Sequence, residues 1–371
     1  METKSLYLVF ILMLFIDCNK KDTNNHSSDF ESYVNSHPLT EVKKVDNYKK
    51  SLEEQIIEPL RLSISPGGKV IVIDDSDWSL HMLATSGKII NSTGGVGKGP
   101  GEFLQINDIF IDNNERLYVY DGKMKRLTIF DLTEEDFELV NVINLPKYES
   151  LHFKSLYING NYRLGVFNKR IDKRTGDTKK VFYRLKNNFE LDTKITSIPG
   201  NEKIKGRNYW FDKPLGKSML WDIQSNILYY AHNKSFTVHS LNLRNKKKQT
   251  FDFTDEPVFR GTTENQKYLN EFFSPLRKMY DNYDQLIKET ESLPLFTWFK
   301  VHENNIYFTL FNPSKKKGSL LRMNIETGGL DIIKVSYRFV LYDIFDDRLF
   351  GINHENNEVT ILQLSDTDAG L

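Results

Sequence analysis

The stretch that decides the fold reads Gly94-Gly95-Val96-Gly97-Lys98-Gly99-Pro100-Gly101-Glu102-Phe103. It holds five glycines and one proline in ten residues, a composition that suits neither a helix nor the interior of a strand. Strand-like runs lie before it and after it, the second at residues 106–112. We therefore expect a structured connection between two sheets, in which the glycines adopt positive φ and Pro100 stiffens the turn.

A unit of four short strands recurs on both sides of this connection. The clearest copy lies at residues 106–112, 116–121, 126–131 and 139–144, with good turn formers between the strands. Related units lie at residues 60–92, 153–198, 219–253 and 298–335, and the last one, at 340–364, has only three strands. A segment near residues 40–46 is expected to supply the missing outer strand and so to close a ring without free edges. The sequence thus predicts an all-β, six-bladed β-propeller with four-stranded antiparallel blades.

The composition agrees with this fold class and excludes several functions. Aromatic residues reach 13%, with 25 Phe and 18 Tyr, and these residues favour strands. The formal net charge is +0, so nothing in the overall charge indicates a nucleic-acid partner. The chain has one cysteine, which excludes intramolecular disulfides and zinc sites built from several cysteines.

The N-terminal residues indicate export. Lys4 precedes eleven apolar residues at 6–16, too few for a permanent membrane span but typical of a signal peptide. Cys18 follows directly, and its place resembles that of the lipid-bearing cysteine in bacterial lipoprotein signals. The alternative is a plain secretory signal with an incidental cysteine. We expect residues 1–18 to be the signal with its lipidation site, and the polar residues 19–39 to be a flexible tether.

The propeller is expected to span residues 40–371. When the first strands of the blades are aligned, one position recurs at intervals of 47, 47, 67, 78 and 43 residues. The six residues at this position are expected to line the central channel: Arg61, Asp108, Ser155, Asp222, Lys300 and Asp343. The two long intervals locate insertions near residues 201–216 and 262–292. The second insertion carries apolar residues at three- and four-residue steps, which predicts a short helical segment between blades 4 and 5.

The glycine-rich segment at residues 97–103 and the strands that follow it also carry a family resemblance. Together with the signal and cysteine at the start, they resemble the six-bladed β-propeller lipoproteins of Bacteroidetes, which are similar to NHL-repeat propellers. The resemblance covers the whole chain and matches best over the first two blades. It implies a propeller fold and a place in the cell envelope, anchored by lipid to the outer membrane. The family's biochemical role is poorly defined, so the resemblance implies no activity.

A ligand face is expected where outer strands lead into the next inner strand, because these connections emerge on one side of a propeller. The glycine-rich stretch fails the tests for a nucleotide loop, since Gly99 follows Lys98 and a strand follows the loop. The candidate ligand-binding residues on this face are Lys98, Glu102, Phe103, Arg207, Tyr209, Trp210 and Phe211. Their aromatic faces suit a glycan or a peptide. The alternative is that the aromatic residues only pin their loop to the propeller.

The three channel aspartates allow a second hypothesis. Asp108, Asp222 and Asp343 could converge on Ca²⁺ at the channel mouth, although Arg61 and Lys300 at equivalent positions would then compete as ion-pair partners. We expect no cofactor and lean against enzymatic activity. The first hypothesis is a non-catalytic binding or scaffold module that engages a glycan, peptide or envelope protein. The second is a metal-assisted hydrolase or lyase that acts from the channel. A membrane contact is expected only through the lipid anchor.

Overall fold

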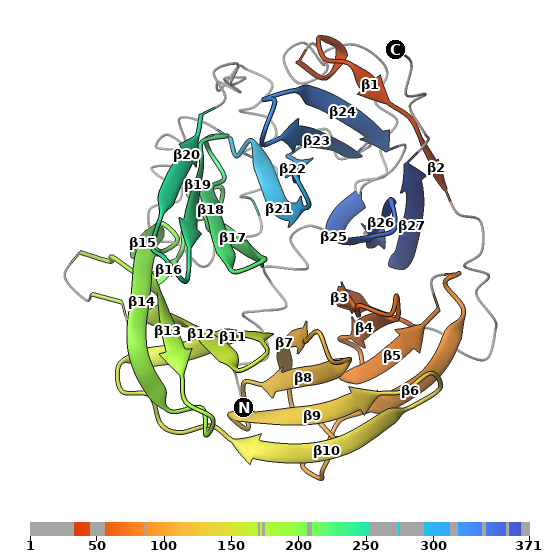
Figure 1. Ribbon diagram of the computed structural model, residues 1–371, viewed down its shortest axis with the longest axis vertical. Coiled ribbons are helices and arrows are strands. Elements are labelled where there is room, and N and C mark those ends of the chain that lie inside the picture. Colours follow the sequence, from red (N-terminus) through yellow and green to blue (C-terminus); the bar gives the residue numbers. More distant parts are fainter. Residues whose placement is uncertain are drawn as a thin grey trace.

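The chain folds as a six-bladed β-propeller. The structure, a computed structural model, describes residues 33–44, 56–84, 86–169, 171–172, 175–205, 210–252, 270, 274, 293–311, 318–335, 339–353 and 356–364. Over these residues it is an all-β ring of six antiparallel sheets around a centre (Figure 1), so the predicted fold class is confirmed. The predicted signal at 1–18, including Cys18, lies outside the described residues. So does the predicted helical insertion at 262–292, apart from Asn270 and Ser274.

Each blade is a meander in which the chain runs outward from the centre of the ring. Blade 1 comprises β3 (Pro59–Ile64), β4 (Val70–Asp74), β5 (Ser79–Leu83) and β6 (Ile89–Gly94); blade 2 comprises β7 (Ile106–Ile111), β8 (Arg116–Asp121), β9 (Arg126–Leu132) and β10 (Phe137–Asn144). Blade 3 comprises β11 (Leu151–Asn159), β12 (Tyr162–Lys169), β13 (Lys179–Leu185) and β14 (Leu191–Pro199); blade 4 comprises β17 (Met219–Gln224), β18 (Ile227–His232), β19 (Val238–Asn242) and β20 (Lys248–Phe251). Blade 5 comprises β21 (Phe296–His302), β22 (Asn305–Leu310), β23 (Gly318–Asn324) and β24 (Leu330–Val335); blade 6 comprises β25 (Phe339–Phe345), β26 (Arg348–Asn353) and β27 (Glu358–Leu364).

Strands from the N-terminal side complete the last two blades. β2 (Val42–Lys44) pairs antiparallel with β27 and supplies the fourth strand of blade 6, with Val42 opposite Leu364. This pairing confirms that a segment within residues 40–46 closes the ring. β1 (Leu39–Thr40) was not predicted; it lies parallel to β24 as a fifth strand of blade 5. The two N-terminal strands therefore cover the outer edges of β24 and β27 in neighbouring blades.

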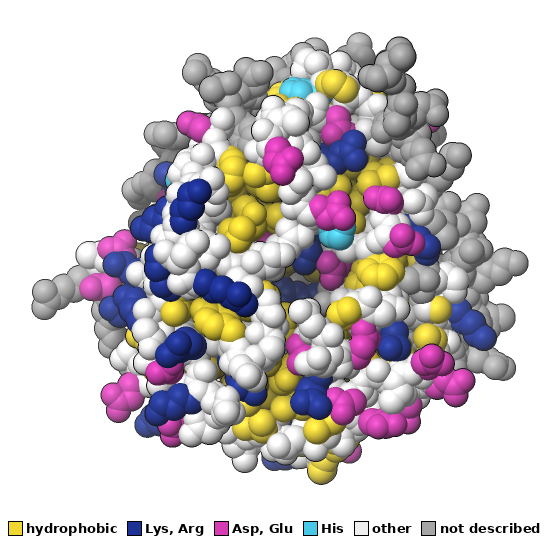
Figure 2. Space-filling view, viewed as in Figure 1, with side chains coloured by type: hydrophobic (Ala, Val, Ile, Leu, Met, Phe, Trp, Pro, Cys, Tyr) yellow, Lys and Arg dark blue, Asp and Glu magenta, His cyan; other side chains and the backbone are white. Residues whose placement is uncertain are grey.

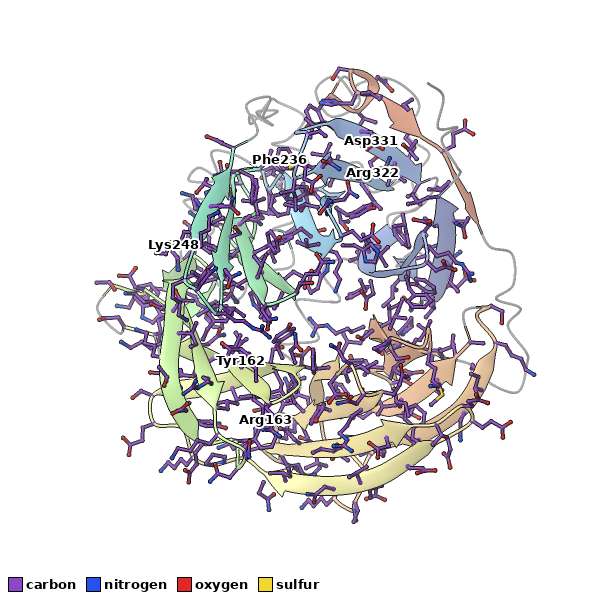
Figure 3. The ribbon with its side chains drawn as sticks, in the orientation of Figure 1. Tyr162, Arg163, Phe236, Lys248, Arg322 and Asp331 are labelled. Carbon is purple, nitrogen blue, oxygen red and sulfur yellow. The ribbon has the colours of Figure 1, made fainter. Side chains whose placement is uncertain are left out.

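A polar clamp fixes β1 on blade 5. Arg322 donates to both carboxylate oxygens of Asp331 over 2.8 and 3.0 Å, and the Thr40 hydroxyl donates to Asp331 over 2.6 Å. Arg322 and Asp331 lie side by side on β23 and β24 near the place where β1 joins the sheet (Figure 3). Thr40 itself is 5% exposed. A buried hydroxyl that is satisfied by an ion pair holds its strand in one register.

The predicted tether ends earlier than residue 39. Val34 is only 4% exposed and packs in the hydrophobic cluster between blades 4 and 5. Tyr33 stacks on Phe236 with ring centroids 6.4 Å apart, and Lys334 donates to the Asn35 side chain over 2.9 Å. Residues 33–39 therefore belong to the propeller body, because Tyr33 and Val34 bury apolar surface that a solvated tether would leave in water.

Hydrophobic clusters between neighbouring blades hold the ring together. One cluster joins Ile73 and Leu80 of blade 1 to Leu117 and Phe130 of blade 2. Burial is most complete on the second strand of a blade, as in β4, where all five residues are buried. The innermost strands are only partly buried, as in β17, and the outermost strands are largely exposed, as in β10 and β20. Each fully buried large apolar side chain stabilises the fold by about 1.5–3 kcal/mol, so the seams between blades carry most of the stability.

A buried aspartate at the end of the second strand repeats between blades 1 and 2. Asp121 is 0% exposed and accepts N–H groups from Leu104 at 2.7 Å and from Lys123 at 2.9 Å. Asp74 of blade 1 is 2% exposed and accepts Ile57 N–H at 2.6 Å and Ser76 N–H at 2.9 Å. Each carboxylate therefore bonds both to the turn that follows its strand and to the connection that enters its blade. Buried carboxylate oxygens need hydrogen-bond donors of this kind.

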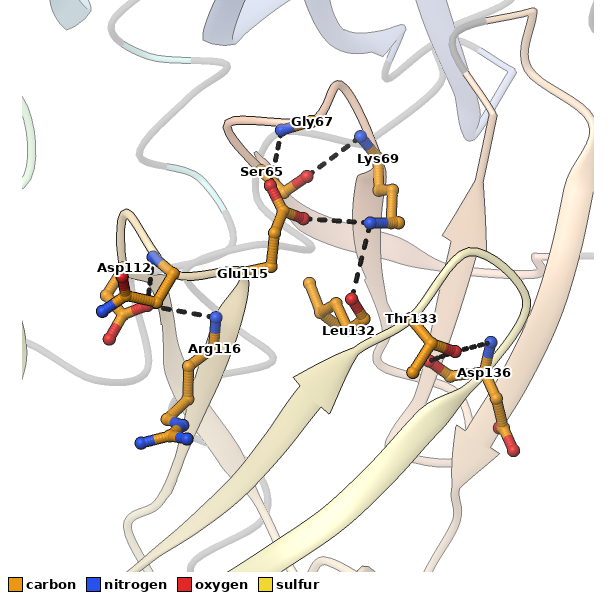
Figure 4. Close-up of polar contacts among 10 residues, drawn as sticks. Ser65, Gly67, Lys69, Asp112, Glu115, Arg116, Leu132, Thr133 and Asp136 are labelled. Atoms are coloured by element: carbon orange, nitrogen blue, oxygen red, sulfur yellow. Dashed lines mark hydrogen bonds and ion pairs between the residues drawn. The ribbon is translucent and has the colours of Figure 1, made fainter.

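The opposite side of the same two blades is joined by a lysine and a glutamate. Lys69, at the turn after β3, contacts Glu115 at 3.1 Å, and Glu115 also accepts the Gly67 N–H (Figure 4). Lys69 also donates to the Leu132 carbonyl over 3.4 Å. These contacts link the inner hairpins of blades 1 and 2, so the two blades that match the repeat best are also bonded at both ends.

Candidate functional site

The glycine-rich connection between β6 and β7 needs its glycines for two different reasons. Gly94, Gly95 and Gly101 have φ of 98°, 100° and 81°, as predicted for a left-handed turn. Gly97 and Gly99 do not adopt positive φ; a side chain there would collide with the carboxylate of Glu102, which lies across this backbone. Glu102 accepts the Gly99 N–H at 2.7 Å. The connection is therefore a compact turn closed on itself.

A buried arginine holds this connection against blade 2. Arg126, the first residue of β9, is 8% exposed and donates to three backbone carbonyls of the loop. The distances are 3.0 Å to Lys98 O, 2.7 Å to Gly99 O and 2.6 Å to Glu102 O. Charge-assisted hydrogen bonds of this kind are stronger than neutral ones. Arg126 was not among the predicted site residues, because an arginine at the start of a strand looks like a surface residue in the sequence.

The structure corrects one predicted ligand-binding residue on this connection. Phe103 is 0% exposed and packs in the hydrophobic cluster between blades 1 and 2, so it anchors the loop and cannot face a ligand. Lys98 and Glu102 lie on the exposed side of the loop. Glu102 is partly engaged by the loop's own backbone, whereas Lys98 is an exposed cation of the loop.

The second candidate segment, the connection between β14 and β17, forms a small hairpin. β15 (Lys203–Lys205) pairs antiparallel with β16 (Trp210–Asp212), and the pair forms a separate two-stranded sheet. Trp210 lies so close to Gly176, in the turn between β12 and β13, that any side chain at Gly176 would collide with its ring. Phe211 packs on the edge of the cluster between blades 4 and 5.

These contacts favour the pinning role of the two described aromatic residues, Trp210 and Phe211. Neither is fully buried, so part of each ring stays at the surface. Two ion pairs brace the base of the hairpin, Lys203 with Asp212 at 2.5 Å and Lys213 with Glu202 at 2.9 Å. The other two predicted residues here, Arg207 and Tyr209, lie outside the described residues.

The six predicted channel residues all lie on innermost strands, one from each blade. The three aspartates lie on the even-numbered blades 2, 4 and 6. They alternate around the ring with Arg61, Ser155 and Lys300, which lie on the odd-numbered blades. An isoleucine follows each aspartate. Its N–H donates back to the carboxylate, over 2.9 Å from Ile223 to Asp222 and 3.1 Å from Ile344 to Asp343. The same carboxylates accept an N–H from the next blade, Val301 at 2.9 Å and Ile64 at 3.0 Å.

The cations of the ring pair with its acids. Arg61 forms an ion pair with Asp108, and Lys300 lies between Asp343 at 3.2 Å and Asp222 at 3.7 Å. Burial alone would lower the pKa of Lys300, but the two aspartates outweigh it and raise the pKa above its usual value. Burial raises the pKa of Asp108, and Arg61 and Ser155 oppose that shift. Charged groups gather at the centre of the viewed face (Figure 2).

Arg61 also reaches an aromatic pair formed by blades 5 and 6. Its guanidinium lies over the Trp298 ring, 5.4 Å from the centroid, and Trp298 contacts Tyr342 with centroids 5.5 Å apart. The Tyr342 hydroxyl donates to the Leu60 carbonyl over 3.1 Å. Arg61 of blade 1 therefore connects Asp108 of blade 2 to Trp298 of blade 5. Cation–π contacts add about 0.5–2 kcal/mol, so this inner layer is a braced element of the scaffold.

The described residues contain no group of three or more His, Cys, Asp or Glu side chains arranged to hold a metal ion. The three aspartates of the ring are engaged by Arg61, by Lys300 and by backbone N–H groups. Within the same described residues, no helix is long and apolar enough to cross a membrane.

Comparison with known proteins agrees with the fold. No curated protein sequence matches the chain. A solved structure from Bacteroides fragilis, whose name marks it as a candidate exported protein, shares 12% identity at a TM-score of 0.52; the match covers 93% of this chain and 98% of that one. A member of the DUF4221 family from Bacteroides vulgatus shares 10% identity at a TM-score of 0.52, over 84% and 94% of the two chains. Identities this low show the fold alone.

The sequence itself carries the family assignment. Residues 51–340 match the family DUF5128, described as a 6-bladed beta-propeller. This range includes the glycine-rich connection, the β15–β16 hairpin and five of the six ring positions; Asp343 lies just beyond it. The predicted resemblance to six-bladed propellers is thereby confirmed, while the lipoprotein and NHL-like details stay predictions. The chain belongs to the 6-bladed beta-propeller family DUF5128.

Proposed function

We propose that this protein is an exported, lipid-anchored propeller that acts as a non-catalytic binding module of the cell envelope. The pairing of the ring acids is the observation that carries this proposal. Asp108, Asp222 and Asp343 are engaged by Arg61, Lys300 and backbone N–H groups. Acids that already have cationic partners are poor ligands for a catalytic metal, since the metal would have to displace a charge that is in place.

The binding surface in this proposal is the face that carries the inter-blade connections. Lys98 and Glu102 come from the glycine-rich connection and Trp210 comes from the hairpin, so charged and aromatic groups stand on rigid blades. Binding sites are commonly built from loops on such scaffolds. The ligand would be a glycan, a peptide or another envelope protein, and neither nucleic acid nor a spanning segment enters the proposal.

The competing hypothesis, a metal-assisted hydrolase or lyase, requires the ring acids to bind a metal. It is tested by metal analysis of the purified propeller and by thermal melts with EDTA and with added Ca²⁺. A ligand that binds only the native state raises Tm. We expect no stoichiometric metal. Any effect of Ca²⁺ on Tm should be the same in the wild type and in Asp222→Asn. A bound metal, or a shift lost in that variant, would favour the hydrolase or lyase.

Binding itself is tested with an array of envelope glycans and by affinity capture from the envelope fraction. Loss of capture on deletion of residues 203–212, with the melting temperature kept within a few degrees, is the result expected of a ligand face. Capture that survives this deletion and the Lys98→Ala change would place the binding surface elsewhere. Fractionation of the Cys18→Ala chain tests the anchor, and the altered protein should move from the membrane to the soluble envelope fraction.

A further inference from the structure

The ion pair that holds β1 on blade 5 has a counterpart on blade 3. In blade 5, Arg322 near the end of β23 binds Asp331, the second residue of β24. In blade 3, Arg184 near the end of β13 donates from Nε to Asp192, the second residue of β14. An apolar cross-strand pair lies beside the ion pair in both blades: Met323 with Leu330, and Leu185 with Leu191. The last two strands of blades 3 and 5 therefore carry the same polar pair at the same place.

The two ion pairs differ in what covers them. In blade 5, the Thr40 hydroxyl donates to Asp331 over 2.6 Å, and the Ile332 N–H donates to the Pro38 carbonyl over 2.8 Å. In blade 3, β14 is the last strand of its sheet, and no described strand pairs with its outer edge (Figure 1). The side chains of the covered pair are 24% and 19% exposed, whereas those of Arg184 and Asp192 are 50% and 32% exposed. Blade 3 thus shows the same ion pair without a covering strand.

The outer edge of β14 beside Asp192 is short, but it is as long as β1 requires. Thr193 and Lys194 follow Asp192, are exposed, and pair on their inner side with Arg184 and Tyr183. The register between β13 and β14 shifts on either side of this two-residue segment, and such irregularities limit how far another strand can continue along an edge. β1 itself consists of two residues, so a segment of this length is sufficient for the same kind of contact.

We infer that the outer edge of β14 binds an extended segment of a partner protein that carries a threonine or a serine. The segment would run parallel to β14 as a fifth strand of blade 3, as β1 does on blade 5. Its hydroxyl would donate to Asp192, as Thr40 donates to Asp331. Backbone hydrogen bonds would supply affinity, and the charge-assisted bond to the carboxylate would select a hydroxyl residue.

The occupant is a segment of another protein and not β1 of a second copy. In its own chain, β1 follows Tyr33 and Val34, which pack on the cluster between blades 4 and 5, and Asn35, which accepts a hydrogen bond from Lys334. These contacts keep β1 on its own blade. The edge beside Asp192 lies at the start of β14, whereas the β15–β16 hairpin follows its end. The inference therefore adds a second binding surface to the proposed ligand face and does not depend on it.

A peptide with the sequence of residues 36–42 is the probe, because it contains the Leu39–Thr40 segment that an ion pair of this kind already binds in blade 5. The peptide carries a photoreactive group, is irradiated with the whole propeller, and its attachment point is read by mass spectrometry. We expect attachment within residues 191–199. Attachment confined to β24 would show that the peptide merely displaces β1, and attachment spread over all outer strands would show unspecific edge binding; either result would overturn the inference.

Fluorescence anisotropy of the labelled peptide provides matched variants. Asp192→Asn should weaken binding by about tenfold, as expected when a hydrogen bond loses its charged acceptor. Asp131→Asn, which removes the comparably exposed partner of Arg116 in blade 2, should change binding less than twofold. Both variants should melt within a few degrees of the wild type, because exposed ion pairs add little stability. Equal effects of the two variants on binding would contradict the inference.

A change in the peptide tests the hydroxyl contact itself. Thr40→Val in the peptide should weaken binding to the wild type by about tenfold, but should cause no further loss with Asp192→Asn, because both changes remove the same hydrogen bond. Additive losses would refute that contact. Self-association of the wild-type propeller that disappears in Asp192→Asn would assign the edge to a second copy and overturn the partner assignment. Peptide binding should survive deletion of residues 203–212; its loss would place the peptide on the ligand face instead.

Discussion

The glycine-rich connection and the β15–β16 hairpin both lead from the outer strand of one blade to the inner strand of the next, yet different interactions hold them. The first is fixed by its own backbone, by Arg126 and by the buried Phe103. The second rests on the blades through Trp210 at Gly176 and through Phe211 at the edge of the cluster between blades 4 and 5, while its ion pair between Lys203 and Asp212 lies within the hairpin. The first is therefore fixed mainly by hydrogen bonds and a fully buried ring, whereas the hairpin is fixed by partly buried aromatic contacts.

The largest difference is expected from the anchoring side chains. Phe103→Ala should lower the free energy of unfolding by about 3–5 kcal/mol, because it removes a fully buried ring and leaves a cavity. Urea unfolding followed by tryptophan fluorescence measures this. Val96→Ala in the same loop is the control; Val96 is 66% exposed, and its loss should cost less than about 0.5 kcal/mol. Similar values for the two variants would contradict the anchoring role of Phe103.

Arg126 provides the next test. Arg126→Met should cost about 1–3 kcal/mol, because three carbonyls lose a charged donor while the stem of the side chain is kept. Amide exchange of Gly97 and Phe103, which both bond within the loop, should become faster, whereas exchange in the hairpin should not change. Unchanged exchange at those two amides would show that the backbone network alone holds the loop.

Gly176 tests how the hairpin is seated. Gly176→Val should destabilise by about 1–2 kcal/mol, because φ is 78° there and the new side chain would meet the Trp210 ring. In combination with Trp210→Ala, the steric part should disappear and only the backbone part should remain, which a double-mutant cycle measures. Strictly additive effects would mean that the two residues do not press on each other.

The smallest effect expected is a pH dependence of stability that comes from Lys180, on the blade next to the hairpin. The folded pKa of Lys180, about 8, is below the value for an unfolded lysine, so the unfolded chain binds more protons between about pH 8 and 10.4. Stability contributed by this site should therefore rise as pH increases through that window. The free energy of unfolding is measured at pH 8 and pH 10 for the wild type and for Lys180→Met, and its change between the two pH values is compared. An equal change in the two proteins would contradict the lowered pKa.

The fold could be predicted because the repeat leaves a regular record in the sequence. Asp74 and Asp121 lie one repeat apart and accept equivalent backbone N–H groups in blades 1 and 2. The ring position likewise recurs from Arg61 to Asp343. Register in a buried strand is strongly specified by its apolar pattern. Aligned strands therefore place aligned residues at the same depth, and that is why the ring network followed from simple intervals.

The candidate site was less predictable because it depends on contacts between repeats. Phe103 stands among glycines and looks exposed, although its ring enters the seam between two blades. Lys180 did not stand out in the sequence, since nothing there indicates that Asp212 and Lys203, which lie more than 20 residues later, influence its pKa. β1 was missed for the same reason, because two residues are too few for a recognisable strand pattern.

The pairing of β2 with β27 also governs when the molecule can be finished. Val42 meets Leu364, so almost the whole chain must be synthesised before the sixth blade has all four strands. Contacts of such long sequence separation slow folding. Until then, the outer edge of β27 and the N-terminal strands are unpaired, and unpaired edges can pair with strands of other chains. The β2–β27 pair is therefore the step that covers these edges, and a chain in which it has not formed presents backbone groups to which another strand can bind.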